Sequence, residues 1–393
     1  MTPEFNKAYC ILPFIHLHID ENDSIKPCCY GTPIKQYTSD FDFTTDPEFN
    51  KIRGQMLAGE KVGACANCYR VDELGGESYR VRDTTDWVNK LDIHDYKHVI
   101  PSLQYYDIRN DNLCNLSCRI CYPGASSQIE KEYRRIGWFV PETTRQSRMS
   151  EIIDYATVRK VYVAGGEPTV MPEFKKFLQR AIASQRTDIE LQIITNATNL
   201  NAEYCELLGH FKNVNVTVSV DGFDQVNRYI RWPSNWATMV ENIHRLHTIT
   251  PHISFNVTVS MWNVTRLKEL IDFLDAEFNV PIILMNPAVP IPANKKDINT
   301  SPFNFPDRGL AVKRLLELKE TTSYKQEKYF RGQVEFLING ANTTECNLND
   351  LKIFFEYNDQ LDNSRNVQLK DYIPELEQCR DKITKQILNT NAE

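Results

Sequence analysis

The chain has 393 residues, of which 41% are hydrophobic and 25% charged, and its formal net charge is -7. This length exceeds one compact domain, so we expect a main domain of about 200 residues with smaller attachments. No apolar run approaches the roughly 18 residues of a membrane span, and no stretch concentrates Lys and Arg. A membrane protein and a nucleic-acid partner are therefore disfavoured. The first residues lack the basic start and apolar core of a secretory signal, which makes a cytoplasmic location the expectation.

Five cysteines occur early in the chain, at Cys10, Cys28, Cys29, Cys65 and Cys68. Because no export signal precedes them, their clustering favours metal binding in a reducing compartment over disulfides. The set ends in a Cys-x-x-Cys spacing, which also suits tetrahedral zinc. Cys29 could replace Cys28 as a ligand, since neighbouring strand residues point to opposite faces and only one can face a shared site.

From about residue 103, apolar runs alternate with helical patterns, as expected for βα units around a parallel sheet. We expect strands at 103–108, 160–164, 189–194, 214–220, 253–259 and 281–285. Six units fit an α/β fold with a partial (β/α)6 TIM-like barrel. The sequence after the sixth strand turns helical, and we expect helices at 309–318, 327–338 and 351–362.

Three further cysteines stand within eight residues, in the loop after the first of these strands. Cys114, Cys118 and Cys121 have CxxxCxxC spacing. Such a set can hold three irons of a four-iron cluster and leave the fourth open, whereas simple electron carriers usually use four cysteines. A zinc site and three incidental cysteines are the alternatives at this point.

The triplet resembles the signature of the radical S-adenosylmethionine (SAM) superfamily, CxxxCx(aromatic or apolar)C after the first barrel strand. Ile120 takes the position that is often aromatic and can pack on an adenine. After the second strand, the turn Gly165, Gly166, Glu167 and Pro168 resembles the family's GGEP motif, which binds the amino group of the methionine moiety. Two glycines allow close backbone approach, and a carboxylate suits an ammonium group.

Three more positions match this family. Ser219, near the end of the fourth strand, matches a ribose contact, and Arg231 matches the arginine that pairs with the methionine carboxylate, with Arg228 as a competitor. Asn196 matches a Thr-Asn-Gly strand end in which Ala197 replaces the glycine. Because the carboxyl ends of barrel strands carry active sites, these features are expected to converge on one mouth.

The N-terminal cysteines resemble the auxiliary-cluster modules called SPASM and twitch. Cys10, Cys28, Cys65 and Cys68 fit the twitch order of one cysteine before a hairpin, one after it and a CxxC beyond. Here the module precedes the barrel, although it follows the barrel in most relatives. We therefore expect three parts: a twitch-like module at 1–92, a radical SAM partial barrel at 93–300 and a helical C-terminal region at 301–393.

The resemblance implies an enzyme with two 4Fe-4S clusters that cleaves SAM reductively to a 5′-deoxyadenosyl radical. The radical would take a hydrogen from a peptide or small-metabolite substrate, with the auxiliary cluster assisting electron transfer and a flavodoxin- or ferredoxin-type reductant as partner. The cysteines would be ligands, and no acid-base catalyst is assigned. Oxidation, epimerisation, crosslinking and rearrangement stay open. The alternatives are a non-catalytic iron-sulfur carrier and a zinc-stabilised binding scaffold.

Overall fold

The computed structural model describes residues 5–109, 111–142, 147–279 and 281–381. It comprises two compact units, and each is described by itself. The first contains the described residues within 1–112, 143–193 and 206–214, and the second those within 113–142, 194–205 and 215–393. Helix α8 (Ala202–Gly209) and strand β8 (Asn213–Ser219) have residues in both.

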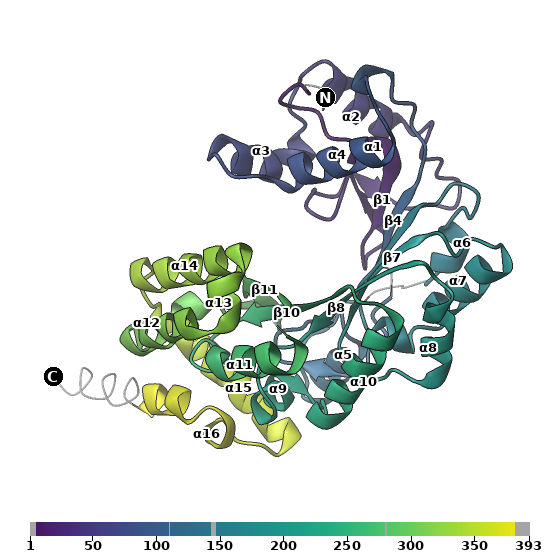
Figure 1. Cartoon of the computed structure of the whole chain (residues 1–393). Helices are drawn as coiled ribbons and strands as arrows, with labels where there is room; N and C mark the ends of the chain where they lie inside the picture. Colours follow the sequence, from purple (N-terminus) through teal and green to yellow (C-terminus); the bar gives the residue numbers. More distant parts are fainter. Residues whose placement is uncertain (1–4, 110, 143–146, 280, 382–393) are drawn as a thin grey trace. The chain divides into compact units, whose positions relative to one another are not determined.

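The first unit is built on a sheet with the strand order β7-β6-β4-β1-β2-β3. These strands are β1 (His16–Ile19), β2 (Ser24–Lys26), β3 (Lys35–Gln36), β4 (Tyr105–Ile108), β6 (Lys160–Val163) and β7 (Glu190–Thr195). β1, β4, β6 and β7 pair in parallel, and β2 and β3 add in antiparallel pairs. The cysteine-rich N-terminal segment thus contributes β1 to the same sheet as β4, and Figure 1 shows the two strands side by side.

The two faces of this sheet differ in chemistry, because successive residues of a strand point to opposite sides. One face is apolar and carries the buried neighbours Leu17, Tyr106, Val161 and Leu191. The other face is polar and carries two rows of neighbours: His16, Tyr105, Lys160 and Glu190, then His18, Asp107, Tyr162 and Gln192. The second row lies nearer the carboxyl ends of the strands.

Helices complete the first unit. They are α1 (Leu12–Ile15), α2 (Pro47–Leu57), α3 (Ala66–Glu73), α4 (Tyr79–Lys90), α6 (Met149–Ile152) and α7 (Pro172–Ala183). In α7, Pro172 stands in the first turn, where its missing N–H leaves no helical bond unmade. Phe174, Phe177, Leu178 and Ala181 follow at spacings of three and four and are buried, so the helix forms around one apolar stripe.

The second unit has a parallel sheet with the order β8-β10-β11 and two short antiparallel pairs, β5-β9 and β12-β13. Its remaining strands are β5 (Ser117–Cys118), β9 (Arg231–Trp232), β10 (Ile253–Val259), β11 (Ile282–Pro287), β12 (Ile291–Ala293) and β13 (Lys296–Ile298). Its helices are α5 (Ser127–Arg135), α9 (Gln225–Ile230), α10 (Trp236–Ile249), α11 (Leu267–Phe278), α12 (Arg308–Glu317), α13 (Thr322–Gln326), α14 (Lys328–Thr343), α15 (Leu348–Arg365) and α16 (Leu369–Tyr372).

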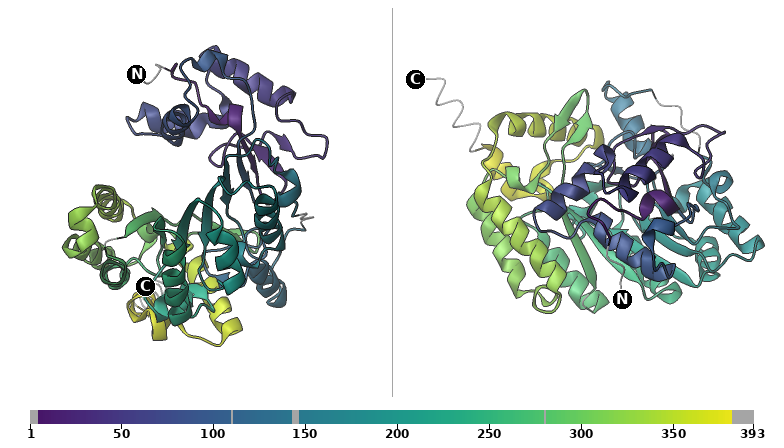
Figure 2. Two further views of the ribbon diagram at one scale, coloured as in Figure 1. Left: turned by 45° about the vertical axis from the view of Figure 1, so that its right-hand side comes forward. Right: turned by 90° about the horizontal axis from the view of Figure 1, so that it is seen from above.

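The C-terminal helices pack as part of the second unit. α12 and α13 contact α14, α14 also contacts β11, and Figure 2 shows these helices gathered together in green. α15 is capped at both ends: the Asn347 side chain accepts the N–H groups of Asn349 and Asp350, and Asn366 closes the helix in the left-handed conformation. Phe354 and Leu361 of α15 are fully buried, which places this helix in the core.

The expected α/β fold class is confirmed. All six expected strands are present as β4, β6, β7, β8, β10 and β11, in the expected order, and within each unit they are parallel. The three expected helices correspond to α12, α14 and α15. Pattern reading missed the pair β5-β9, because strands of two residues are too short to show a period.

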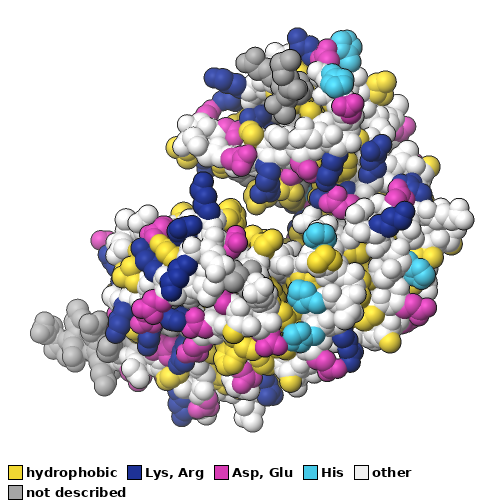
Figure 3. All heavy atoms as spheres, in the orientation of Figure 1, with side chains coloured by type: hydrophobic (Ala, Val, Ile, Leu, Met, Phe, Trp, Pro, Cys, Tyr) yellow, Lys and Arg dark blue, Asp and Glu magenta, His cyan; other side chains and the backbone are white. Residues whose placement is uncertain are grey.

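Within the described part of the chain, no helix combines the length and hydropathy that crossing a membrane requires. On the face shown in Figure 3, the side chains of Lys and Arg are interspersed with those of Asp and Glu. No large area of that face carries charges of only one sign.

Candidate metal centre

Cys114, Cys118 and Cys121 come together in the second unit. Cys114 and Cys118, each 8% exposed, form a buried cluster with Leu116, and Ile120 and Cys121 pack against it. All three cysteines are free thiols. Among the described residues, no group of three His, Cys, Asp or Glu side chains is already arranged to hold a metal ion. Three neighbouring thiols are nevertheless the donor set that an open four-iron cluster takes, so their chemistry fits such a cluster.

Burial controls the ionisation of these thiols. It raises the pKa of Cys121, and the neighbouring Cys118 and Cys114 raise it further. Burial also raises the pKa of Cys118, while the Arg231 guanidinium acts in the opposite direction. A thiol that coordinates a metal is deprotonated outright. Bound iron would therefore offset the electrostatic cost of burying three thiolates close together.

Arg231 stands directly opposite Cys118 in the antiparallel pair β5-β9. Its Nη1 lies 4.0 Å from Cys118 Sγ, and its Nε lies 2.6 Å from Asp221 Oδ2. Asp221 is fully buried and its Oδ1 accepts the Thr258 N–H at 2.7 Å. Asp221 therefore holds one edge of the guanidinium beside the cysteine cluster. The sequence pattern did not assign this carboxylate a role.

Asn196 joins the cysteine loop to the end of β7. Its Nδ2 donates to Asn115 Oδ1 at 2.9 Å, and its Oδ1 accepts the N–H and hydroxyl of Thr198 at 2.9 and 2.6 Å. Asn115 Nδ2 in turn donates to Thr198 Oγ1 at 2.9 Å. Ala197 has φ +55°, the left-handed region that glycine favours. Asn196 thus fixes the residue that follows Cys114.

Ser219 ends β8 and is 9% exposed. It stands opposite Asn256 in the parallel pair with β10. A hydroxyl at the carboxyl end of a strand can both donate to and accept from a ligand.

Gly165 and Gly166 form a tight turn after β6 in the first unit. Their φ values are +87° and +52°, both in the left-handed region. A Cβ on Gly165 would lie 3.3 Å from the Asp111 carbonyl oxygen and 3.4 Å from the Arg109 Cβ. The backbone conformation therefore favours glycine at residue 165, and a Cβ there would also be crowded.

Glu167 and Pro168 continue this turn into a single 3₁₀ turn at Pro168–Val170. Glu167 is buried, and its Oε1 accepts the N–H of Thr169 at 3.2 Å and the Thr169 hydroxyl at 2.8 Å. The carboxylate is consequently held in one orientation before any ligand is bound.

Arg119, between the second and third cysteines, is an anchor that sequence reasoning missed. Its side chain is fully buried, with Nε donating to the Tyr229 carbonyl at 2.8 Å and Nη1 donating to Asn358 Oδ1 at 3.0 Å. Its Nη2 pairs with Asp362. Asn358 and Asp362 belong to α15, so this helix holds the cysteine loop from more than 200 residues away. No local pattern could signal such a contact.

A second contact strengthens the same attachment. Arg365 at the end of α15 donates from Nη2 to the Ser117 carbonyl at 2.7 Å and pairs with Glu132 Oε2 at 2.7 Å. The Tyr357 hydroxyl donates to the Arg119 carbonyl at 2.7 Å. The backbone on both sides of Cys118 is therefore fixed by α15.

Cys10, Cys28, Cys65 and Cys68 gather in the first unit. Cys10 and Cys28 belong to the buried cluster around α1, and Cys65 packs against it. Burial raises the pKa of Cys10, and Cys65 and Cys68 raise it further. Burial likewise raises the pKa of Cys65, with Cys28 and Cys68 adding to the effect. The four thiols are thus close enough to influence one another electrostatically.

Cys28 and Cys29 have different surroundings. After burial, the largest influence on the pKa of Cys28 is Cys10, whereas for Cys29 it is Asp107. Arg109 and Tyr79 also act on Cys29. Cys10 therefore acts more strongly on Cys28 than any other charged group does, and Asp107 has that place for Cys29.

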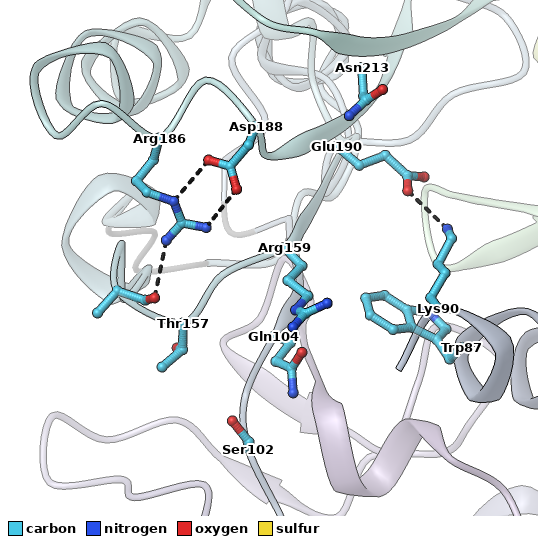
Figure 4. A pocket seen from close by; sticks show the side chains of 11 residues that line it. Trp87, Lys90, Ser102, Gln104, Thr157, Arg159, Arg186, Asp188, Glu190 and Asn213 are labelled. Carbon is cyan, nitrogen blue, oxygen red and sulfur yellow. Dashed lines mark hydrogen bonds and ion pairs between the residues drawn. The ribbon is translucent and has the colours of Figure 1, made fainter. Parts of the chain in front are cut away.

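A polar cavity of about 690 Å³ lies at the opposite, amino-terminal ends of β4, β6 and β7 (Figure 4). Arg186 pairs with Asp188 at 2.9 Å, Glu190 pairs with Lys90 at 2.9 Å and with Lys160 at 3.0 Å, and Arg159 also lines the cavity. No cysteine is among its described lining residues.

Comparison with known proteins points to the same family that the sequence motifs resemble. Residues 112–274 match the model of the Radical SAM superfamily. The chain is 23% identical over 181 residues to the sporulation killing factor maturation protein SkfB of Bacillus subtilis strain 168, covering 44% of this chain and 42% of SkfB. It is 27% identical over 161 residues to the mycofactocin maturase MftC of Mycobacterium tuberculosis strain H37Rv, covering 40% and 38%. The matches span about two fifths of each relative.

Solved structures show weaker likeness. Streptococcus suis SuiB bound to S-adenosylmethionine has 17% identity and a TM-score of 0.40, covering 65% of this chain and 59% of SuiB. That TM-score is too low to define the fold. The matched family segment, however, contains the cysteine triplet, the Gly165 to Pro168 turn, Asn196, Ser219 and Arg231. Residues 112–274 therefore resemble the radical SAM superfamily, and the motifs that carry the resemblance lie within them.

Proposed function

We propose that this protein is a radical SAM enzyme that removes a hydrogen atom from a peptide or small-metabolite substrate. The observation that carries the proposal is the buried cluster of Cys114, Cys118 and Cys121 beside Arg231, inside the matched family segment. When bound, a reduced four-iron cluster supplies the electron that cleaves SAM to a 5′-deoxyadenosyl radical.

The side chains around the triplet suit the parts of SAM. Ile120 offers an apolar surface to the adenine, and Ser219 offers a hydroxyl to the ribose. The guanidinium edge of Arg231 that Asp221 does not occupy is available to the methionine carboxylate. Asn196 would act indirectly, because its hydrogen bond to Asn115 fixes the cysteine loop.

Gly165, Gly166, Glu167 and Pro168 are proposed to bind the methionine amino group, on the basis of their resemblance to the family motif. The turn supports this in two ways. Glycine at 165 leaves its backbone uncovered by a side chain, and the Glu167 carboxylate is already oriented by Thr169. A carboxylate held in advance loses less freedom when it meets an ammonium group.

The N-terminal set is proposed to hold an auxiliary four-iron cluster of the twitch type, with Cys10, Cys28, Cys65 and Cys68 as ligands. Their mutual influence on thiol pKa supports this ligand set, and the influence of Cys10 on the pKa of Cys28 supports the choice of Cys28 over Cys29. Such a cluster would move an electron during substrate oxidation, with a flavodoxin- or ferredoxin-type protein as the external reductant. A cytoplasmic setting would suit both clusters.

The peptide alternative is favoured over a small metabolite. SkfB is named as a maturation protein for a killing factor, and MftC is named as a maturase. Maturation implies modification of a larger precursor. The sequence itself shows no substrate signature.

The test is anaerobic reconstitution with iron and sulfide, followed by dithionite and SAM. The wild type should form 5′-deoxyadenosine, and the variant with Cys114, Cys118 and Cys121 all changed to Ala should form none. Cys205→Ala is the matched control, because this isolated cysteine lies outside both groups. Cleavage by the triple variant would refute the proposal.

Metal analysis tests the auxiliary site separately. We expect about eight irons per wild-type chain and about four in the triple variant, because each cluster holds four. Zinc in place of iron in the triple variant would assign the N-terminal cysteines to a zinc site instead.

A further inference from the structure

Helix α4 holds the backbone on both sides of Cys10, the first of the N-terminal cysteines. The Arg80 guanidinium donates from Nη1 to the carbonyl oxygen of Tyr9 at 2.6 Å, and the Thr84 hydroxyl oxygen accepts the N–H of Ile11 at 3.2 Å. Thr84 is buried, and the side chain of Arg80 is only 10% exposed. Cys10, a proposed ligand, is thus fixed between two contacts from one helix.

The other edge of the same guanidinium is paired with Asp72. Arg80 donates to Asp72 Oδ2 from Nε at 3.0 Å and from Nη2 at 2.7 Å. Asp72 Oδ1 accepts the N–H of Ser78, the residue that caps α4, at 3.3 Å. Asp72 belongs to α3, the helix that also carries Cys68. The Arg80–Asp72 pair therefore joins the segment of Cys10 to the helix of Cys68.

A third contact links α3 to the same segment. The buried Tyr69, which follows Cys68, donates from its hydroxyl to the Ala8 carbonyl oxygen at 2.9 Å. The Arg80 guanidinium lies 5.7 Å from the centre of the Tyr69 ring. The side chain of Asp72 is 21% exposed. The charged pair consequently stands among the backbone segments that carry the cysteines, where solvent screens it less than it would on an open surface.

Both charges of the pair act on the neighbouring thiols. Burial raises the pKa of Cys68, the Arg80 backbone N–H lowers it, Asp72 raises it and the Arg80 guanidinium lowers it. Burial and two neighbouring cysteines raise the pKa of Cys65, and the Arg80 guanidinium opposes them. The guanidinium and the carboxylate thus act on the sulfur atoms in opposite directions, as charges of opposite sign should.

We propose that Arg80 and Asp72 set the reduction potential of the auxiliary cluster, Arg80 by raising it and Asp72 by lowering it. The inference rests on the proposed function, because it concerns the cluster that the four N-terminal cysteines are proposed to hold. Neither residue is a ligand. Both act on the cluster through its surroundings, as charges and hydrogen bonds near iron-sulfur clusters do in general.

The direction of each effect follows from the charge that reduction adds. Reduction by one electron makes the cluster more negative by one unit. A nearby guanidinium stabilises that added charge, and a nearby carboxylate destabilises it. The electron comes from the substrate oxidation or from the external reductant of the proposed function, so no further reactant is needed.

The experiment uses the full chain with Cys114, Cys118 and Cys121 all changed to Ala, so that the auxiliary cluster is observed by itself. The protein is reconstituted with iron and sulfide, and EPR follows its titration with dithionite and redox mediators. Arg80→Gln in this background should lower the ratio of reduced to oxidised cluster at a fixed potential by about 10-fold, which is about 59 mV for one electron. Asp72→Asn should raise the ratio by a similar factor.

Three further variants serve as controls. Arg80→Lys keeps a positive charge at residue 80 and should stay near the potential of the parent protein. Arg82→Gln removes a cation from the same helix, but the Arg82 side chain is 61% exposed, so the ratio should change by less than about 2-fold. The double variant with Arg80→Gln and Asp72→Asn loses one charge of each sign, and its two shifts should largely cancel.

Shifts of the same sign in Arg80→Gln and Asp72→Asn would overturn the inference, and so would shifts no larger than that of Arg82→Gln. Either result leaves the pair as a structural contact. If Arg80→Gln does not fold, Asp72→Asn decides alone, because it retains Arg80 and must raise the potential. Failure of the proposed function looks different: the parent protein itself would then hold zinc or no iron, which also removes the inference.

Discussion

Cys118 and Arg231 face each other across the two-residue pair β5-β9, with Arg231 Nη1 4.0 Å from the cysteine sulfur. The backbone pairing of the two strands places the two residues opposite each other. Asp221 also holds the Nε edge of the same guanidinium in place. The positive charge beside the cluster therefore does not depend on the free rotation of a long side chain.

Arg231→Gln should lower the free energy of unfolding by about 3–5 kcal/mol, because it leaves Asp221 as a buried charge without its partner. Urea unfolding of the protein measures this. Arg228→Gln, one turn away on an exposed position, is the control and should change stability by less than about 0.5 kcal/mol. Equal effects of the two variants would contradict the assigned role of Asp221.

Cys28→Ser and Cys29→Ser should separate the two neighbouring cysteines. Cys28 is proposed as a ligand beside Cys10, which influences its pKa most after burial, so its loss should remove about four irons per chain from the reconstituted protein. For Cys29 the corresponding influence is Asp107, so its loss should leave the iron content unchanged. Iron and sulfide analysis decides the matter, and the reverse pattern would move the ligand role to Cys29.

Gly165→Ala should destabilise the protein by about 1–3 kcal/mol and weaken SAM binding, because residue 165 has φ +87° and a Cβ there would be crowded. Gly54→Ala is the opposite case. Gly54 lies inside α2 with nothing within 4 Å of a new Cβ, so alanine there should stabilise by about 0.5–1 kcal/mol. Thermal unfolding and SAM titration measure both. Unchanged SAM binding by Gly165→Ala would argue against the turn as a ligand site.

Asp362→Ala should cost about 3–5 kcal/mol of stability, since Arg119 is fully buried and would lose its counter-charge. Asp359→Ala lies on the same helix but breaks only the half-exposed pair with Arg380, and it should cost at most about 1 kcal/mol. Denaturant unfolding compares the two. A small effect for Asp362→Ala would contradict a stabilising role of the Arg119–Asp362 pair.

Glu190 should make folding stability depend on acid pH. Burial acts to raise its pKa, but Lys160 and Lys90, the latter drawn beside it in Figure 4, lower it below 4.5. A folded-state pKa below the unfolded one gives stability that is full above about pH 4.5 and is lost as the pH falls through the folded value. The stability difference between wild type and Glu190→Gln should therefore shrink on acidification. A difference independent of pH would contradict this ion pairing.

Local sequence predicted much of the fold, because the signals that decide it are local. The strand 253–259 shows apolar alternation and the helix at 327–338 shows apolar spacing of three and four, and both occur as β10 and α14. The backbone conformation at the motif glycines was also predictable from the sequence. Gly165 has the positive φ that its motif position demands, and Ala197, which replaces a family glycine, also has one.

The side-chain contacts that hold the cysteine loop in place could not be predicted from local patterns. Arg119 reads as an ordinary charge between two cysteines, and Asp362 as an ordinary charge on a helix. Their pairing depends on tertiary packing across more than 200 residues. His18 shows the same limit: alternation on a strand indicates which face it occupies, but only the register with β4 brings it to Asp107.

The attachment of the cysteine loop to α15 has a consequence for how the protein is made. The triplet leaves the ribosome early, yet Ser117 and Arg119 find their partners only when Arg365 and Asp362 have also been synthesised. Until then the loop lacks the contacts that fix its backbone. The rigid frame around the three cysteines is thereby tied to the synthesis of α15, and a chain that stops before this helix would carry the cysteines without that frame.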